Sequence, residues 1–170
     1  MFRSWKFIFL VIVSVFFLAA CGKSLEVRIG EGLRSAEKVF YENNKVANEQ
    51  IDGVKFYKPS EFTIKEGSDS QNIILTTKKD TFILFNNPNE KMDSRLFYDL
   101  LKADDTKKII DEKTFTDGDI FGFAAVVENN DTVELIASVG GTKITTLAKK
   151  RDVASHLTVM MEILRSIQKK

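Results

Sequence analysis

The sequence predicts an α+β fold: a mainly antiparallel sheet of about six to seven strands, packed by an N-terminal, a middle and a C-terminal helix. Three observations support this prediction. Apolar and polar residues alternate in segments through the middle and the last third of the chain. Short turn sequences separate these segments, as in antiparallel hairpins. Apolar stripes at steps of three and four mark helices near both ends. We expect a single domain at residues 33–170.

The first predicted helix covers residues 33–50, where apolar side chains recur at helical spacing. Gly30 and Gly32 precede it, and each weakens a helix by about 1 kcal/mol relative to alanine. Residues 21–32 are therefore expected to form a tether. The helix at 33–50 either packs on the domain or binds a partner helix or the membrane surface.

The middle of the chain alternates with a period of two and is predicted to form strands. These predicted strands lie at residues 53–57, 61–66, 72–78 and 81–86. A second helix is predicted at 94–103, where apolar residues share one face. Residues 107–116 are ambiguous, with a short strand at 113–116.

The last third gives the clearest pattern, with predicted strands at 120–128, 132–139 and 143–148. The turns Asn129-Asn130-Asp131 and Gly140-Gly141 supply residues that tolerate positive φ. A final helix is predicted at 152–168, with Asp152 as its N-cap.

Two stretches carry a family resemblance. One is Gly53-Val54-Lys55-Phe56-Tyr57-Lys58-Pro59, followed closely by Phe62. The other is the closing hairpin with a helix that ends Ile163-Leu164-Arg165-Ser166-Ile167. With this order of elements, residues 53–167 resemble the Mog1/PsbP-like fold. The resemblance implies an adaptor or assembly factor rather than an enzyme, and it assigns no functional residue.

The first 20 residues have the layout of a secretory signal peptide. Arg3 and Lys6 form a basic start, and residues 7–20 carry no charge. This run is too short for a comfortable membrane-spanning helix, which needs about 20 apolar residues. It ends Leu18-Ala19-Ala20-Cys21, which resembles the lipobox of bacterial lipoproteins.

The lipobox resemblance implies cleavage between Ala20 and Cys21, which removes residues 1–20. It also implies a diacylglyceryl group on the Cys21 sulfur, and leaves the new amine open to acylation. Two or three acyl chains give stable anchoring, whereas one binds a membrane only marginally. Cys21 is the only cysteine, which excludes a disulfide within the chain. We therefore expect a lipid-anchored protein on the extracytoplasmic face of the bacterial cell membrane.

Candidate catalytic and metal-binding residues are few. His156 is the only histidine, and Asp152, four residues earlier, can share its helical face and orient it as a general base. A capping aspartate beside a surface histidine is the simpler interpretation. Asp117-Gly118-Asp119 and Glu128-Asn129-Asn130-Asp131 offer oxygens for calcium, but neither fits the calcium-loop pattern. We therefore predict no catalytic residue, no metal ligand and no cofactor.

Charge restricts the choice of partners. Without residues 1–20 the formal net charge falls from +1 to −1, so a basic nucleic-acid-binding domain is excluded. Neither Gly30-Glu31-Gly32 nor Gly140-Gly141 lies between a strand and a helix, as a phosphate-binding loop requires. The basic run Lys149-Lys150-Arg151, with Lys143 and Lys169-Lys170, either contacts anionic lipid headgroups or forms a solvated surface.

Three functions are compatible with this sequence. The first is a non-catalytic protein-binding or accessory module of the cell envelope, and it ranks highest because no catalytic set is found. The second is a small-ligand or lipid-binding lipoprotein, with an apolar groove between sheet and helix. The third is a hydrolase that uses Asp152 and His156.

Overall fold

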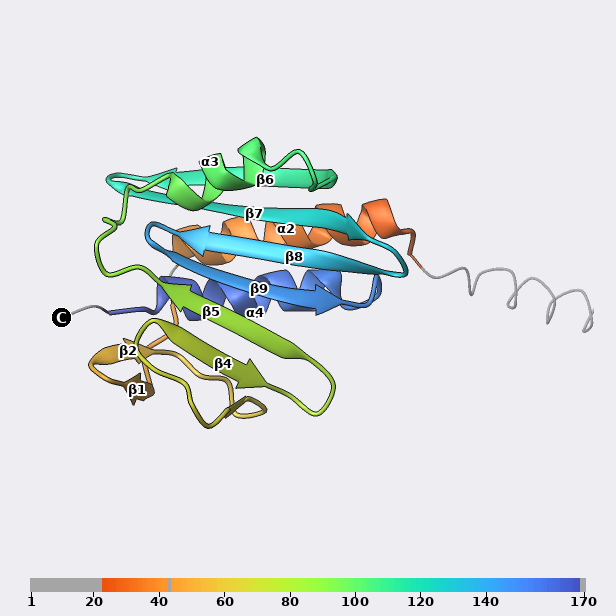
Figure 1. Ribbon diagram of the computed structural model, residues 1–170. Helices are drawn as coiled ribbons and strands as arrows, with labels where there is room; N and C mark the ends of the chain where they lie inside the picture. The colour runs from red at the N-terminus through yellow and green to blue at the C-terminus, as the bar shows by residue number, and fades with distance from the viewer. Residues whose placement is uncertain (1–22, 43, 169–170) are drawn as a thin grey trace, which may run out of the picture.

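The computed structural model describes residues 23–42 and 44–168 (Figure 1). Its main element is a seven-stranded sheet in the order β3-β4-β5-β9-β8-β7-β6, and all neighbouring strands are antiparallel. The strands of this sheet are β3 (Thr63–Ile64), β4 (Asn72–Thr76), β5 (Thr81–Asn86), β6 (Ile109–Asp117), β7 (Ile120–Asn129), β8 (Thr132–Val139) and β9 (Thr142–Ala148). A separate hairpin is formed by β1 (Glu49–Ile51) and β2 (Val54–Phe56).

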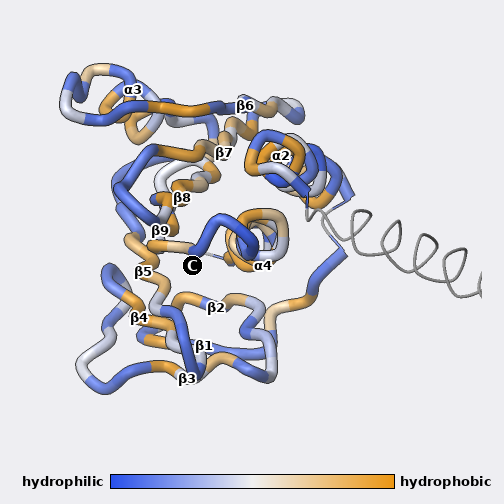
Figure 2. The backbone as a smooth tube through the Cα atoms, turned by 90° about the vertical axis from the view of Figure 1, so that its right-hand side faces the viewer, coloured by the Kyte–Doolittle hydropathy of each residue, from blue (hydrophilic) through white to orange (hydrophobic). Residues whose placement is uncertain are grey.

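Three helices complete the described part of the chain and confirm the expected α+β class. Helices α2 (Leu25–Glu42) and α4 (Val153–Arg165) lie side by side on one face of the sheet. Helix α3 (Leu96–Ala103) lies on the opposite face, as the side view in Figure 2 makes clear. The signal peptide, Cys21 and Lys169-Lys170 lie outside the described residues.

The larger core fills the space between the sheet and the helix pair α2 and α4. Alternate residues of each strand point into it, as the two-residue period of a strand requires. Buried aromatic rings dominate it, with the centroids of Phe40 and Phe115 5.2 Å apart. A smaller core lies under α3, where Phe97 and Leu101 pack on β7. The sheet is therefore covered completely on one face and only in part on the other.

The expected tether is wrong for the residues from Leu25 onward, because α2 begins there and not at residue 33. Gly32 lies where α2 crosses α4. A Cβ added to Gly32 would stand 3.0 Å from Leu157 Cδ1 and 3.1 Å from Ala154 Cα. Glycine here allows close helix packing, which compensates for its low helix propensity. Helix α2 packs on the domain through buried side chains. Of the two alternatives for this helix, packing on the domain is therefore the one that the structure shows, rather than binding to a partner helix or to the membrane surface.

The same helix ends at Glu42, earlier than the expected residue 50, because residues 49–51 pair with β2 instead. Asp52 and Gly53 form the turn of this hairpin with φ angles of 44° and 89°. Two residues with positive φ are typical of the tight hairpin turns that Asp-Gly favours. The second strand of this hairpin lies within the strand predicted at residues 53–57, whereas its first strand falls where the sequence predicted the end of a helix.

Two further boundaries differ from the expectation. Strand β6 runs from Ile109 to Asp117, longer than the expected 113–116, because β7 offers it a partner along its whole length. Helix α4 ends at Arg165, and Gln168 then forms a β-bridge with Lys55. Asp152 is the N-cap residue of α4, but its side chain makes no capping hydrogen bond.

Candidate functional site

The part of the sheet that α3 leaves uncovered forms an open face on β5 and β9. Because Phe82, Leu84 and Ile144 point into the larger core, their strand neighbours point to the other side. Ile83 of β5 and Leu147 of β9 are 48% and 58% exposed on that side. Large apolar side chains that remain in contact with water beside each other mark a candidate interaction surface.

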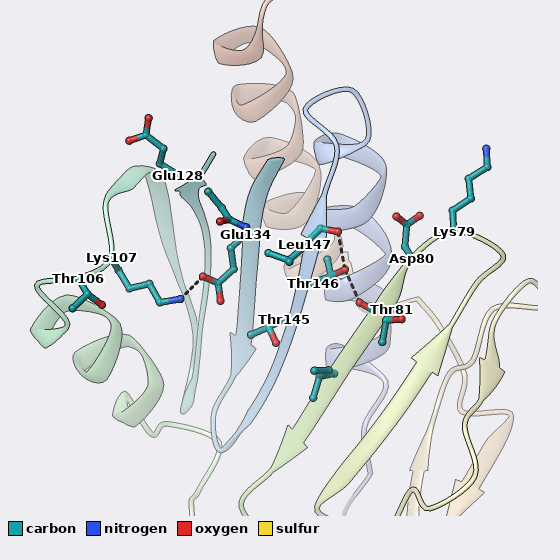
Figure 3. A pocket seen from close by; sticks show the side chains of 12 residues that line it. Lys79, Asp80, Thr81, Thr106, Lys107, Glu128, Glu134, Thr145, Thr146 and Leu147 are labelled. Atoms are coloured by element: carbon teal, nitrogen blue, oxygen red, sulfur yellow. Dashed lines mark hydrogen bonds and ion pairs between the residues drawn. The ribbon is translucent and has the colours of Figure 1, made fainter. Parts of the chain in front are cut away.

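A groove of about 790 Å³ runs over this face. Its floor is formed by threonines and the two apolar side chains of β5 and β9, and charged side chains from strands β7 and β8 and from neighbouring loops surround it (Figure 3). The charged residues are Lys79, Asp80, Lys107, Glu128 and Glu134. Thr146 donates a hydrogen bond of 2.7 Å to the carbonyl oxygen of Thr81, which joins the two strands at the floor.

A smaller hollow of about 150 Å³ continues from the groove beneath α3 and shares Lys107, Glu134 and Thr145 with it. Its other walls include Phe97 and Lys143. The hollow is thus more apolar on the side of α3 and more polar toward the open groove.

The hollow contains one paired lysine and one lysine without an ion-pair partner. Lys107 and Glu134 form an ion pair. The ammonium of Lys143 lies 5.0 Å from the centroid of the Phe97 ring, and it forms no ion pair within residues 23–42 and 44–168. Burial lowers the pKa of Lys143, and nearby Lys107 lowers it further while Glu134 opposes the shift. Lys143 is a partly desolvated cation suited to an anionic group.

The predicted pairing of His156 with Asp152 is not formed. Nε2 of His156 lies 3.4 Å from Oδ2 of Asp80, in the turn between β4 and β5. The carboxylate of Asp152 instead lies 3.6 Å from Nε of Arg151. Tertiary packing explains why His156 pairs with Asp80 instead. The face of α4 that carries His156 packs against β5, and the centroid of the His156 ring lies 5.0 Å from that of the Phe82 ring.

The His156–Asp80 pair is a feature that sequence reasoning missed. Nε2 of His156 is buried and has no hydrogen-bond partner among the described residues. The nearest hydroxyl, Ser155 Oγ, lies 3.5 Å from Nδ1, and it also donates to the carbonyl oxygen of Asp152. A general base must reach the proton it removes within about 3.2 Å. Within the described part of the chain, this arrangement therefore contains no poised nucleophile, and the hydrolase hypothesis gains no support.

The remaining candidate motifs lie in turns. Asp117-Gly118-Asp119 joins β6 to β7, and Glu128-Asn129-Asn130-Asp131 joins β7 to β8. In the described residues, no group of three or more His, Cys, Asp or Glu side chains is placed to hold a metal ion. Gly140-Gly141 forms the turn between β8 and β9, as expected.

The basic residues do not form one surface. Lys143 stands at the start of β9 and faces the hollow under α3, whereas Lys149-Lys150-Arg151 follows the other end of that strand. Lys149 and Lys150 are exposed. None of the helices in the described ranges is long and apolar enough to cross a membrane.

Comparison with known proteins adds little. No family model matches the chain, and no curated protein matches it. The solution structure of cyanobacterial PsbP (CyanoP) from Synechocystis sp. PCC 6803 is similar at 11% sequence identity, over 70% of this chain and 88% of that chain, with a TM-score of 0.42. A similarity at this level does not indicate the function of the chain.

Proposed function

We propose that this chain is a lipoprotein anchored through Cys21 at the extracytoplasmic face of the bacterial cell membrane, and that its domain is a non-catalytic binding or accessory module of the envelope. The observation that carries the proposal is the sequence Leu18-Ala19-Ala20-Cys21 at the end of a signal-peptide-like segment. A diacylglyceryl group on the sulfur, with or without an acyl group on the amine, supplies stable anchoring.

The anchor holds the domain near the membrane. Helix α2 begins at Leu25, four positions after Cys21. Even a fully extended chain spans at most about 14 Å over four residues. The partner is therefore expected within reach of the bilayer surface.

The open groove is the surface we assign to that partner. It is broad, its floor exposes Ile83 and Leu147, and its charged rim includes the Lys107–Glu134 ion pair. Sites for small molecules bury roughly 70–90% of their ligand, which an open face of this kind does not favour. An apolar centre with a polar rim is the usual composition of a protein–protein interface.

A photo-crosslinking residue in place of Leu147 tests this function in cells. We expect it to capture one reproducible envelope protein. The matched control carries the same crosslinker in place of Tyr41, which is 51% exposed on α2 at the other face of the sheet. Equal capture at both positions, or none at Leu147, would overturn the groove as the binding surface.

A small-ligand or lipid-binding function is the second candidate, and Lys143 is the observation that favours it. Its ammonium borders the apolar hollow beneath α3 without a carboxylate partner in the described residues. Such a site suits the acidic group of an amphiphile. Native mass spectrometry of the purified protein tests this, because a bound anionic amphiphile should be lost in Lys143→Met.

A further inference from the structure

The groove has two borders at the end of the sheet where β5 begins and β9 ends. On one side lie the turn between β4 and β5 and the residues after β9, which we call the β5 border (residues 77–80 and 149–152). On the other side lie the connection from α3 to β6 and the turn between β7 and β8, which we call the β7 border (residues 104–108 and 128–131). Figure 3 shows Lys79 on the first side and Lys107 and Glu128 on the other.

The β5 border carries an excess of positive charge. Asp152 lies beside Arg151, which balances it, and Asp80 and the exposed Glu61 ahead of β3 add two acids. Four exposed lysines outnumber these acids, and none of them forms an ion pair with another described residue. These lysines are Lys78, Lys79, Lys149 and Lys150.

The β7 border carries an excess of negative charge. Its two lysines are already paired, Lys107 with Glu134 and Lys108 with Glu128. Three further carboxylates are exposed or half-buried and form no ion pair with another described residue. These are Asp104, Asp105 and Asp131. The end of the domain is therefore close to balanced as a whole, but its two signs are separated across the groove.

The centre between the borders is apolar. Ile83 and Leu147 are 48% and 58% exposed in the groove, and Leu100 of α3 is 57% exposed. Leu100 lines the hollow beneath α3, which shares Thr145 with the groove. An apolar centre with opposite charges on its two sides is complementary to itself when it is turned over, which is the property that a symmetric dimer requires.

We infer that the open groove binds the same face of a second copy of this chain, related to the first by a two-fold axis parallel to the strands. Such a rotation exchanges the two borders and keeps the two ends of the sheet in place. The basic β5 border of each copy then lies against the acidic β7 border of the other, and Leu100 of each copy packs toward the Ile83 of the other. Complementary charges of this kind fix the orientation in which two proteins associate.

The lipid anchor is compatible with this symmetry. The inference rests on the proposed function and names the partner of the groove. Nη1 of Arg28 in α2 donates a hydrogen bond of 3.3 Å to the carbonyl oxygen of Arg151, so α2 begins at the end that carries both borders. A two-fold axis parallel to the strands leaves the starts of both α2 helices at one end, where both Cys21 anchors reach the same membrane. Confinement to one membrane also raises the effective concentration of each copy for the other.

Cysteine cross-linking in membranes tests the dimer with the full lipidated chain. Cys21 is the only cysteine, and lipidation would consume its thiol, so introduced thiols are the reactive ones. Two differently tagged copies carry Leu100→Cys and Ile83→Cys, and a short bismaleimide should join them in a dimer that holds both tags. The matched control replaces Leu100→Cys with Tyr41→Cys, which is 51% exposed on α2. Equal yields from the two pairs, or no mixed-tag dimer from Leu100→Cys, would overturn the inference.

Charge reversal tests the orientation within the same assay. Lys79→Glu or Asp105→Lys, introduced into both copies, should weaken association by roughly tenfold, because each reversed charge acts twice across a two-fold axis. The two reversals combined in one chain should restore the yield of the mixed-tag dimer. Lys55→Glu reverses a charge at an exposed position on β2 and should change nothing. A combined variant that stays as weak as the single ones contradicts the pairing of the borders and overturns the dimer.

Failure of this inference and failure of the proposed function are distinguishable. Intact-mass measurement of the membrane fraction reports the lipid on Cys21 independently of the cross-linking. A lipidated chain that gives no mixed-tag dimer overturns the second copy as the occupant and leaves the anchor intact. Capture of a different protein by the photo-crosslinker at Leu147 would then keep the groove as the binding surface. A chain without the lipid overturns the anchor and the inference that rests on it.

Discussion

Gly32 of α2 and Ala154 of α4 approach so closely that a Cβ on Gly32 would stand 3.1 Å from Ala154 Cα. Few real Cβ atoms tolerate such a contact with backbone. The larger core depends on this crossing, because α2 and α4 together cover one face of the sheet. A residue that looks like a helix breaker in the sequence is therefore part of the packing of the helix.

Gly32→Ala is predicted to destabilise the protein. Alanine favours a helix over glycine by about 1 kcal/mol, but overpacking a tight contact costs roughly 1–3 kcal/mol. Urea unfolding should report a net loss of free energy of unfolding. Gly30→Ala is the matched control, since its Cβ would meet only the flexible end of Arg34 at 3.3 Å. That variant should be as stable as the parent or more so, and equal stability of both variants would contradict the packing argument.

The sequence predicts those parts of the fold that local chemistry decides. The hairpins from Ile120 to Ala148 were predicted correctly, because turn residues and a period of two are local signals. The Asp52-Gly53 turn carried the same kind of signal and was overlooked. The predicted start of α2 was wrong because Gly32 was interpreted as a helix-weakening residue. Its role is to allow close packing against Ala154 and Leu157, which lie more than 100 residues away in the sequence.

The candidate site was less predictable. The groove exists because α3 covers β7 and leaves Ile83 and Leu147 exposed. The position of a helix on a sheet depends on tertiary packing, so local sequence patterns do not predict it. The partner of His156 was also missed, because spacing along one helix suggested Asp152 and the fold supplies Asp80. The expectation of a lipid on Cys21 lies outside the described residues and stays a prediction.

His156 and Asp80 are predicted to be energetically coupled. Both side chains are largely buried, so the interaction is screened less than at the surface. A double-mutant cycle with His156→Ala and Asp80→Ala should give a coupling of about 0.5–1.5 kcal/mol in urea unfolding near pH 6. The same cycle with Asp152→Ala should give a coupling close to zero. A larger coupling with Asp152 would restore the pairing that the sequence suggested.

Lys143→Met is predicted to stabilise the protein at neutral pH. Burial lowers the pKa of Lys143 below its ordinary value of 10.5, so the folded state holds this proton less tightly than the unfolded state does. Between the lowered pKa and 10.5 the unfolded state binds more protons, and the stability of the parent protein therefore rises with pH. The advantage of Lys143→Met over the parent should shrink as pH rises toward 10.5.

Urea unfolding of the parent and of Lys143→Met across this pH range measures that difference. Lys55→Met serves as the control, because it removes the same charge from an exposed position on β2. A difference between the parent and Lys143→Met that stays constant with pH would contradict the role assigned to burial.

Cys21→Ser is predicted to abolish anchoring. Serine has no thiol to receive the diacylglyceryl group, and the lipobox resemblance makes cleavage before residue 21 dependent on that group. The variant should accumulate as an uncleaved precursor that retains residues 1–20, or be released from the membrane. Intact-mass measurement of the membrane and soluble fractions checks both outcomes. Gly22→Ser is the control, because it alters the neighbouring residue and keeps the sulfur. A Cys21→Ser chain that is trimmed to residue 21 and still held in the membrane would show that another feature anchors the domain.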